Sequence, residues 1–197
     1  AVGQREMSTP LLQIDAVSKS FGGLKAVQNV SLQVQTGTLT ALIGPNGAGK
    51  TTLFALMSGF ITPDAGRIVF AGQDITGHAP DANARRGMAR TFQIVQPFAP
   101  QSVRENIAVG AHLHTPNRAL ALEQASSVAA RVGLSALLDQ PAGELTVAGR
   151  KRLELARTLA TQPRLLLVDE VLAGLSPQEV AEMIPVERGR AEARVTV

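Results

Sequence analysis

An eight-residue segment near the first quarter of the chain specifies a loop that binds phosphate. It reads Gly44-Pro45-Asn46-Gly47-Ala48-Gly49-Lys50-Thr51 and fits the pattern G-x-x-x-x-G-K-[S/T] at every specified position. Glycines let the backbone turn tightly with successive N–H groups aimed inward, which makes a nest for an anion. Residues 38–43 before it form a short apolar run, and residues 50–59 after it carry apolar side chains at helical spacing. We therefore expect a strand, a phosphate-binding loop and a helix in that order.

The same pattern predicts the ligands of a nucleotide. The N-terminus of the helix adds partial positive charge, and Lys50 supplies a compact cation to the β- and γ-phosphates. The Thr51 hydroxyl is placed to bind Mg²⁺, with Thr52 next to it. These residues, together with the six that precede Lys50, are the candidate binding residues for ATP.

A second segment supplies the carboxylates that such a loop needs. Residues 165–168 are four apolar residues in a row, as in a parallel strand covered on both faces, and Asp169 and Glu170 follow them. We expect Asp169 to bind Mg²⁺ through water. Glu170, one residue on, points elsewhere and is the candidate for orienting and deprotonating the attacking water.

The remaining patterns predict an α/β fold of the P-loop NTPase type, with a mostly parallel central sheet around the phosphate loop. Expected strands lie at 11–17, 27–34 and 67–71, and expected helices at 102–110, 118–132, 135–138, 150–160 and 178–184, with the start of a strand at 195–197. The predicted organisation is an extension at 1–10, a nucleotide-binding core with an antiparallel β subdomain at 11–95, a helical insert at 96–149 and the rest of the core at 150–197. Met7 is a candidate natural start, with residues 1–6 as an upstream extension.

Composition narrows the class of protein. The chain of 197 residues is 45% apolar and 18% charged, which is typical of a globular domain and not of a disordered chain. It has no cysteine, so disulfides and thiolate chemistry are excluded, and no apolar run reaches the roughly 18–20 residues of a membrane span. The net charge of +3 comes mainly from scattered Arg residues, so no nucleic-acid partner is expected. His78, His112 and His114 lack accompanying carboxylates and are interpreted as surface residues rather than metal ligands.

Six segments together resemble the ATP-binding subunits of ABC transporters, and within them the ATPases of branched-chain amino acid importers. They are residues 19–27, the phosphate loop, residues 87–93, 102–106 and 145–157, and the strand before Asp169, so the resemblance runs from about residue 11 to the end. It implies hydrolysis of ATP with Mg²⁺, a second ATPase subunit in a homo- or heterodimer, and integral membrane permease subunits. It also implies a peripheral position at the cytoplasmic face of the inner membrane.

The resemblance also implies roles that the residues alone leave open. Phe21 would stack on adenine, although a lone Phe before Gly-Gly more often belongs to a core. Gln93, alone a polar residue at a strand end, would contact Mg²⁺ and the attacking water, and joins Lys50 and Glu170 as a catalytic candidate. Thr146, Ala148 and Gly149 would contact a γ-phosphate from a segment, residues 145–149, that departs from the family's Leu-Ser-Gly-Gly-Gln.

Other functions stay open at this stage. The family has a switch histidine after a further strand, whereas no His follows His114, and Ser176 stands where an Asp is usual. We therefore expect a shortened chain that hydrolyses ATP poorly. The alternatives are an importer of urea or another amide, a non-transport ABC ATPase in DNA repair or translation, and a nucleotide-binding regulator.

Overall fold

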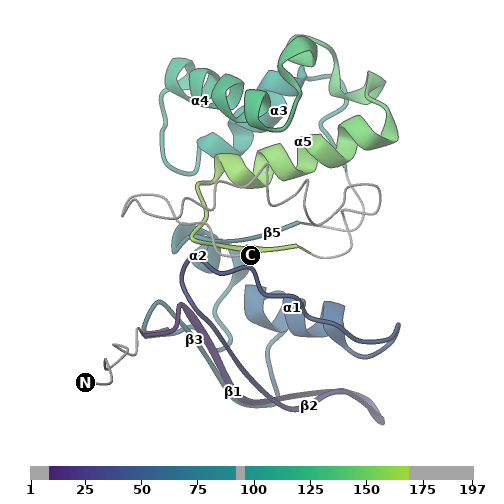
Figure 1. Cartoon of the computed structure of the whole chain (residues 1–197), viewed down its shortest axis with the longest axis vertical. Helices are drawn as coiled ribbons and strands as arrows, with labels where there is room; N and C mark the ends of the chain where they lie inside the picture. The colour runs from purple at the N-terminus through teal and green to yellow at the C-terminus, as the bar shows by residue number, and fades with distance from the viewer. Residues whose placement is uncertain (1–8, 92–95, 169–197) are drawn as a thin grey trace, which may run out of the picture. The chain divides into compact units, whose positions relative to one another are not determined.

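The computed structural model describes residues 9–91 and 96–168, which fall into two compact units divided between Pro80 and Asp81. Figure 1 shows the elements of both units. Each unit is described by itself.

The first unit is built on an antiparallel sheet. Its strands are β1 (Leu12–Phe21), β2 (Leu24–Val34), β3 (Ala65–Phe70) and β4 (Gln73–Asp74), in the order β2-β1-β3-β4. Strands β1 and β2 form a hairpin that closes at Gly22 and Gly23, where Gly22 has a φ of 56° that suits glycine. The antiparallel subdomain expected from the sequence is confirmed.

Helix α1 (Lys50–Ser58) begins directly after the glycine loop, as the apolar spacing predicts. It ends at Gly59, whose φ of 85° is the left-handed conformation common after a helix. The core of this unit consists of apolar side chains of the sheet and of α1, each less than a tenth exposed: Leu12, Ile14, Val17, Leu53, Leu56, Met57, Ile68 and Phe70.

One expected strand is not found. Residues 38–43 form no strand, and their apolar side chains are exposed, with Leu39 at 57%, Leu42 at 39% and Ile43 at 91%. A strand exists only when a neighbouring strand takes its main-chain hydrogen bonds, and the part of the chain that the structure describes pairs no strand with this run. The apolar pattern of residues 38–43 indicates a segment suited to burial, but a strand forms only where a second strand lies beside it.

The second unit contains a parallel pair of strands. Helix α2 (Pro80–Arg85) leads into β5 (Met88–Arg90), which pairs in parallel with β6 (Leu165–Leu167) in the register Met88↔Leu165 to Arg90↔Leu167. All three residues of β6 are buried. The prediction that the apolar run before Asp169 is a buried parallel strand is therefore confirmed.

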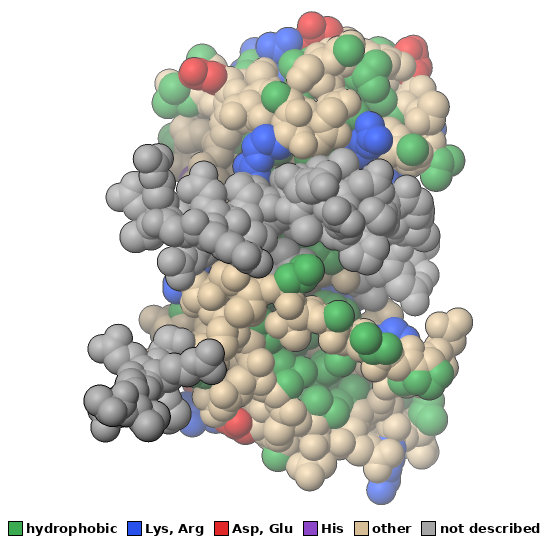
Figure 2. All heavy atoms as spheres, viewed as in Figure 1, with side chains coloured by type: hydrophobic (Ala, Val, Ile, Leu, Met, Phe, Trp, Pro, Cys, Tyr) green, Lys and Arg blue, Asp and Glu red, His purple; other side chains and the backbone are tan. Residues whose placement is uncertain are grey.

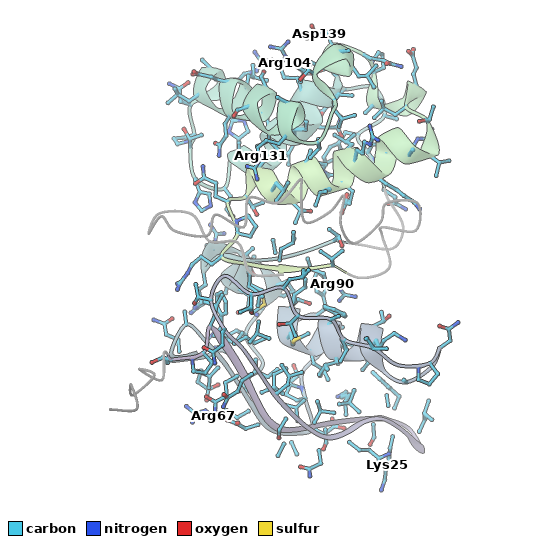
Figure 3. The ribbon with its side chains drawn as sticks, viewed as in Figure 1. Lys25, Arg67, Arg90, Arg104, Arg131 and Asp139 are labelled. Atoms are coloured by element: carbon cyan, nitrogen blue, oxygen red, sulfur yellow. The ribbon has the colours of Figure 1, made fainter. Side chains whose placement is uncertain are left out.

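Three helices make up most of this unit: α3 (Val103–Ala111), α4 (Arg118–Arg131) and α5 (Val147–Ala160), with short 3₁₀ turns at Ser135–Leu137 and Ala142–Glu144. Their facing side chains form one core with Leu166 of β6. Helices α3 and α5 approach closely at Gly110, where an added Cβ would lie 2.2 Å from the Arg157 carbonyl oxygen. Arg104 and Asp139 point toward each other at the surface (Figure 3), with 3.0 Å between Nη2 and Oδ1.

Local capping explains where the helices begin. Ser102 and Glu105 form a capping box at α3, and Asn117 accepts two main-chain hydrogen bonds at the start of α4. None of the helices in the described ranges is long and apolar enough to cross a membrane.

Candidate functional site

The phosphate loop has the backbone that its glycines predict. Gly47 and Gly49 have φ angles of 80° and 83°, which other residues rarely adopt. Gly49 also lies against β2, so that a Cβ there would be 2.2 Å from the Ala26 carbonyl oxygen. Any side chain at this position would therefore push the loop away from the strand, whereas glycine lets the main chain line the site.

Lys50 lies over this loop. Its Nζ donates hydrogen bonds to the carbonyl oxygens of Gly44 at 2.7 Å and Pro45 at 2.8 Å. The first turn of α1 contains no acidic residue, so no carboxylate there offsets the partial positive charge of the helix N-terminus. Thr51 is exposed, as a residue that reaches a ligand must be. The loop, the ammonium and the helix end thus place positive charge in one location.

A cavity of about 410 Å³ opens between this loop and β2. It is lined by main chain and side chains of Gly47–Lys50, by the lysine at 25 and by apolar residues that include Val27, Val30, Leu42 and Leu53. Figure 2 shows hydrophobic side chains gathered between α1 and β2 on this unit, and Lys25 lies at the tip of the hairpin in Figure 3. Phe21 is not among the lining residues.

Phe21 ends β1 and is 45% exposed, so it is not part of the core. The Lys19 ammonium lies 5.8 Å from the centre of its ring. An exposed aromatic ring can stack on a planar base, and its role in adenine binding stays a prediction.

Thr146 directly precedes α5, which begins at Val147, three residues earlier than the sequence indicates. Its hydroxyl accepts a hydrogen bond from Gly149 N–H at 3.2 Å, which makes it the N-cap of the helix. The predicted helix start at Arg150 is therefore wrong, because Thr capping draws Val147 and Ala148 into the first turn. Three residues at the start of α5 are exposed, namely Thr146, Val147 and Ala148, whereas Gly149 is buried. Residues 145–149 therefore present a helix N-terminus at the surface.

Three candidate residues, Gln93, Asp169 and Glu170, lie outside the described residues. The strands that precede them end side by side: Arg90 pairs with Leu167, and Thr91 N–H donates to the Leu167 carbonyl oxygen at 3.0 Å. Gln93 and Asp169 therefore follow, within three residues, the carboxyl ends of two adjacent parallel strands. Ligands commonly bind at that edge of such a sheet.

Two residues that the sequence analysis missed hold the segment after Gln93. Asn106 of α3 is fully buried and bonds to the main chain of Phe98, Gln101 and Ser102. Arg157 of α5 donates to the Gln96 carbonyl oxygen at 3.1 Å and lies 5.1 Å from the Phe98 ring centre. A polar Asn on the apolar face of a predicted helix was the one signal in the sequence that could have identified the first of them.

The family model described as ABC transporter matches residues 27–173 of this chain, which includes the loop, the parallel pair and α5. The chain belongs to the ABC transporter family. It is an ATP-binding ABC ATPase with the P-loop fold, and the resemblance drawn from its motifs is confirmed.

Curated relatives of this ABC ATPase cover most of its length. It is 39% identical over 192 residues to the high-affinity branched-chain amino acid transport ATP-binding protein LivG of Escherichia coli K12, an alignment that spans 90% of this chain and 75% of LivG. It is 37% identical over 207 residues to the corresponding protein BraF of Pseudomonas aeruginosa, covering 97% and 81% of the two chains.

Solved structures confirm the fold of this ABC ATPase. The ADP conformation of the ATP-binding cassette MJ1267 matches with a TM-score of 0.79 at 32% identity, over 96% of this chain and 80% of that one. A nucleotide-free cassette matches with a TM-score of 0.76 at 32% identity, over 89% and 75% of the two chains.

Proposed function

We propose that this ABC ATPase energises an importer of branched-chain amino acids by hydrolysing ATP to ADP and phosphate. The observation that supports it most is the glycine loop, where the backbone of Gly47 and Gly49 and the ammonium of Lys50 converge beneath a helix N-terminus. The choice of solute rests on the names of the relatives LivG and BraF.

The loop fits a triphosphate in shape and in charge. A Cβ at Gly49 would fill space that the main chain uses to approach β2, so the glycine is required for the loop's conformation. The carbonyl oxygens of Gly44 and Pro45 hold the Lys50 ammonium at the loop. When a nucleotide binds, the ammonium would exchange these oxygens for those of the β- and γ-phosphates. Residues 44–52 would thus bind the phosphates, and Phe21 the base.

Mg²⁺ would be held by the Thr51 hydroxyl, by Asp169 and by Gln93. When bound, it supplies charge that stabilises the transferring phosphoryl group. Glu170 would orient and deprotonate the attacking water, while Lys50 and the loop amides stabilise charge on the phosphate oxygens. The adjacent carboxyl ends of β5 and β6 support this grouping, since Gln93, Asp169 and Glu170 follow those strands.

Thr146, Ala148 and Gly149 would complete the site of a second ATPase subunit. The exposed N-terminus of α5 supports this proposal, because main-chain N–H groups at a helix end bind phosphate. The second subunit is this chain again or a related ATPase. Integral membrane permeases would bind the pair of ATPases at the cytoplasmic face of the inner membrane. Within each ATPase, the helical insert would span residues 96–149, between the two parts of the nucleotide-binding core.

Titration calorimetry with ATP and Mg²⁺ tests the binding site. Lys50→Ala should abolish the binding heat, because the loop then lacks its cation, while far-UV circular dichroism stays unchanged. Arg85→Ala, which removes an exposed cation from α2, is the matched control and should bind as the wild type does. Equal affinity of Lys50→Ala and the wild type would refute the proposed role of the loop.

The solute is tested by reconstitution with the permease and binding-protein components of the same transporter. ATP-dependent uptake of leucine, isoleucine or valine is expected, and it should stop in the Glu170→Gln variant because the attacking water then lacks its base. Uptake of urea or another amide in place of these amino acids would overturn the choice of solute and leave the ATPase assignment unaffected.

A further inference from the structure

The end of β1 is held by hydrogen bonds to Asp64, a residue outside the phosphate loop and the other segments that resemble the family. Asp64 lies just before β3 and bonds to three consecutive residues of β1. Its main-chain N–H donates to the Ser18 carbonyl oxygen at 2.9 Å, and its carboxylate accepts from Ser20 N–H at 2.7 Å and from the Lys19 ammonium at 2.6 Å. These contacts span 44 to 46 positions of sequence and end one residue before Phe21.

The Asp64 carboxylate accepts a main-chain hydrogen bond of β1 that no carbonyl oxygen of β3 accepts. The β1–β3 pairing ends at Ser18 and Ala65, because β3 begins at Ala65. Beyond this point the Ser20 N–H has no β3 carbonyl opposite it, and the Asp64 carboxylate takes that hydrogen bond instead. Lys19 and Ser20, the two residues before Phe21, are therefore held on this side by the Asp64 carboxylate.

The same carboxylate positions a cation beside the aromatic ring. Lys19 and Phe21 are two residues apart and so lie on one face of the strand. The ammonium that Asp64 holds is 5.8 Å from the ring centre, within the range of a cation–π contact. The ring nevertheless remains 45% exposed, which leaves surface for a second planar group.

The Asp64 carboxylate is charged at neutral pH. The hydrogen bond from Lys19, and after it the one from Ser20 N–H, holds the pKa of Asp64 below its ordinary value. The Lys19 side chain is 18% exposed, so it is the more buried partner of the pair. The ammonium thus has little freedom to leave the ring without breaking the pair.

We propose that Asp64 and Lys19 position Phe21 for stacking on the adenine base, and so set the affinity for ATP without touching the nucleotide. The proposal rests on the proposed function of the site and names two positioning residues for it. Because neither residue is at the phosphate loop, their effect depends on the base and not on the phosphates.

Comparison of ATP with inorganic tripolyphosphate, which lacks the base, separates the two halves of the site. Base–aromatic stacking is worth about 1–3 kcal/mol, so Phe21→Ala should weaken ATP binding by about 5- to 150-fold. Asp64→Ala should weaken it by about threefold to tenfold, since the ring remains but loses its position. Neither variant should weaken tripolyphosphate binding, which also shows that each is folded.

Asp74→Ala is the matched control. Asp74 lies in the same sheet, is exposed, pairs with Arg67 at 2.8 Å and accepts hydrogen bonds from Thr76. Its removal changes the net charge by the same amount as removal of Asp64. ATP affinity should stay at the wild-type value.

The double variant Phe21→Ala/Asp64→Ala decides whether Asp64 acts through the ring. Asp64→Ala should cause no further loss of ATP affinity once the ring is absent. A further threefold loss, an equal loss for ATP and tripolyphosphate, or unchanged ATP affinity in either single variant would overturn the proposal. If the wild type bound neither ligand, the proposed function itself would fail.

Discussion

Asn106 offers the most direct test of how the second unit holds the segment that follows Gln93. Its Oδ1 accepts from Phe98 N–H at 2.9 Å, and its Nδ2 donates to the carbonyl oxygens of Phe98 at 3.1 Å, Gln101 at 3.3 Å and Ser102 at 2.9 Å. The Ser102 carbonyl also accepts from Asn106 N–H at 3.0 Å, so it keeps a partner when the side chain is removed.

The carbonyl oxygens of Phe98 and Gln101 likewise keep main-chain donors, Gln101 N–H and Ala142 N–H. Asn106→Ala therefore removes the side-chain hydrogen bonds at about 1 kcal/mol each and leaves Phe98 N–H without its acceptor, at some further cost. We expect a loss of about 2–3 kcal/mol in the free energy of unfolding. For a chain of this size each kcal/mol lowers the melting temperature by about 2–4 °C, so thermal melting followed by circular dichroism should shift by about 4–12 °C.

Two further variants test the reasoning. Asn117→Ala removes an exposed helix cap and should cost about 1 kcal/mol, which sets the scale for an ordinary polar contact. Asn106→Asp keeps the acceptor for Phe98 N–H but turns a carboxylate toward three carbonyl oxygens, so it should be less stable than Asn106→Ala at pH 7. Protonation would restore one donor, so its deficit should shrink at about pH 4–5. A melting temperature of Asn106→Ala within about 1 °C of the wild type would refute this account.

Two other outcomes follow from single residues. Both amide atoms of Asn83 are buried and have no hydrogen-bond partner within residues 9–91 and 96–168, so Asn83→Leu should raise the free energy of unfolding by about 1–3 kcal/mol. A lower melting temperature of this variant in thermal denaturation would contradict the expectation. Hydrogen bonds from the Thr76 hydroxyl and N–H lower the pKa of Asp74 to about 2. The stabilisation from Asp74 is therefore full above pH 3.8 and is lost as the pH falls toward 2. Carboxyl NMR should give a midpoint near 2 that rises in Thr76→Ala, and a midpoint near 3.8 in the wild type would contradict the structure.

Much of the fold follows from short stretches of sequence. The apolar spacing after Lys50 correctly predicted α1, which ends one residue before the predicted end. The end of α4 also lies within one residue of its prediction. The four apolar residues before Asp169 correctly indicated a buried parallel strand. In each case the signal is local, since helical spacing and continuous burial are properties of adjacent residues.

Errors arose where a distant partner decides the outcome. β1 continues to Phe21, beyond the expected end, because β2 pairs with it, and residues 38–43 form no strand because none of the described strands pairs with them. The early start of α5 has a local cause instead, because the Thr146 hydroxyl accepts a hydrogen bond from Gly149 N–H three residues along the chain.

The sequence by itself determined the phosphate loop, because glycine conformations, the lysine and the helix that follows are contiguous and depend on near neighbours. Only the tertiary structure decided what surrounds Phe21 and what holds the segment after Gln93. Asp64 reaches Lys19 across 45 positions and Arg157 reaches Gln96 across 61. Contacts over such separations depend on how the whole chain closes its loops, which no local pattern specifies.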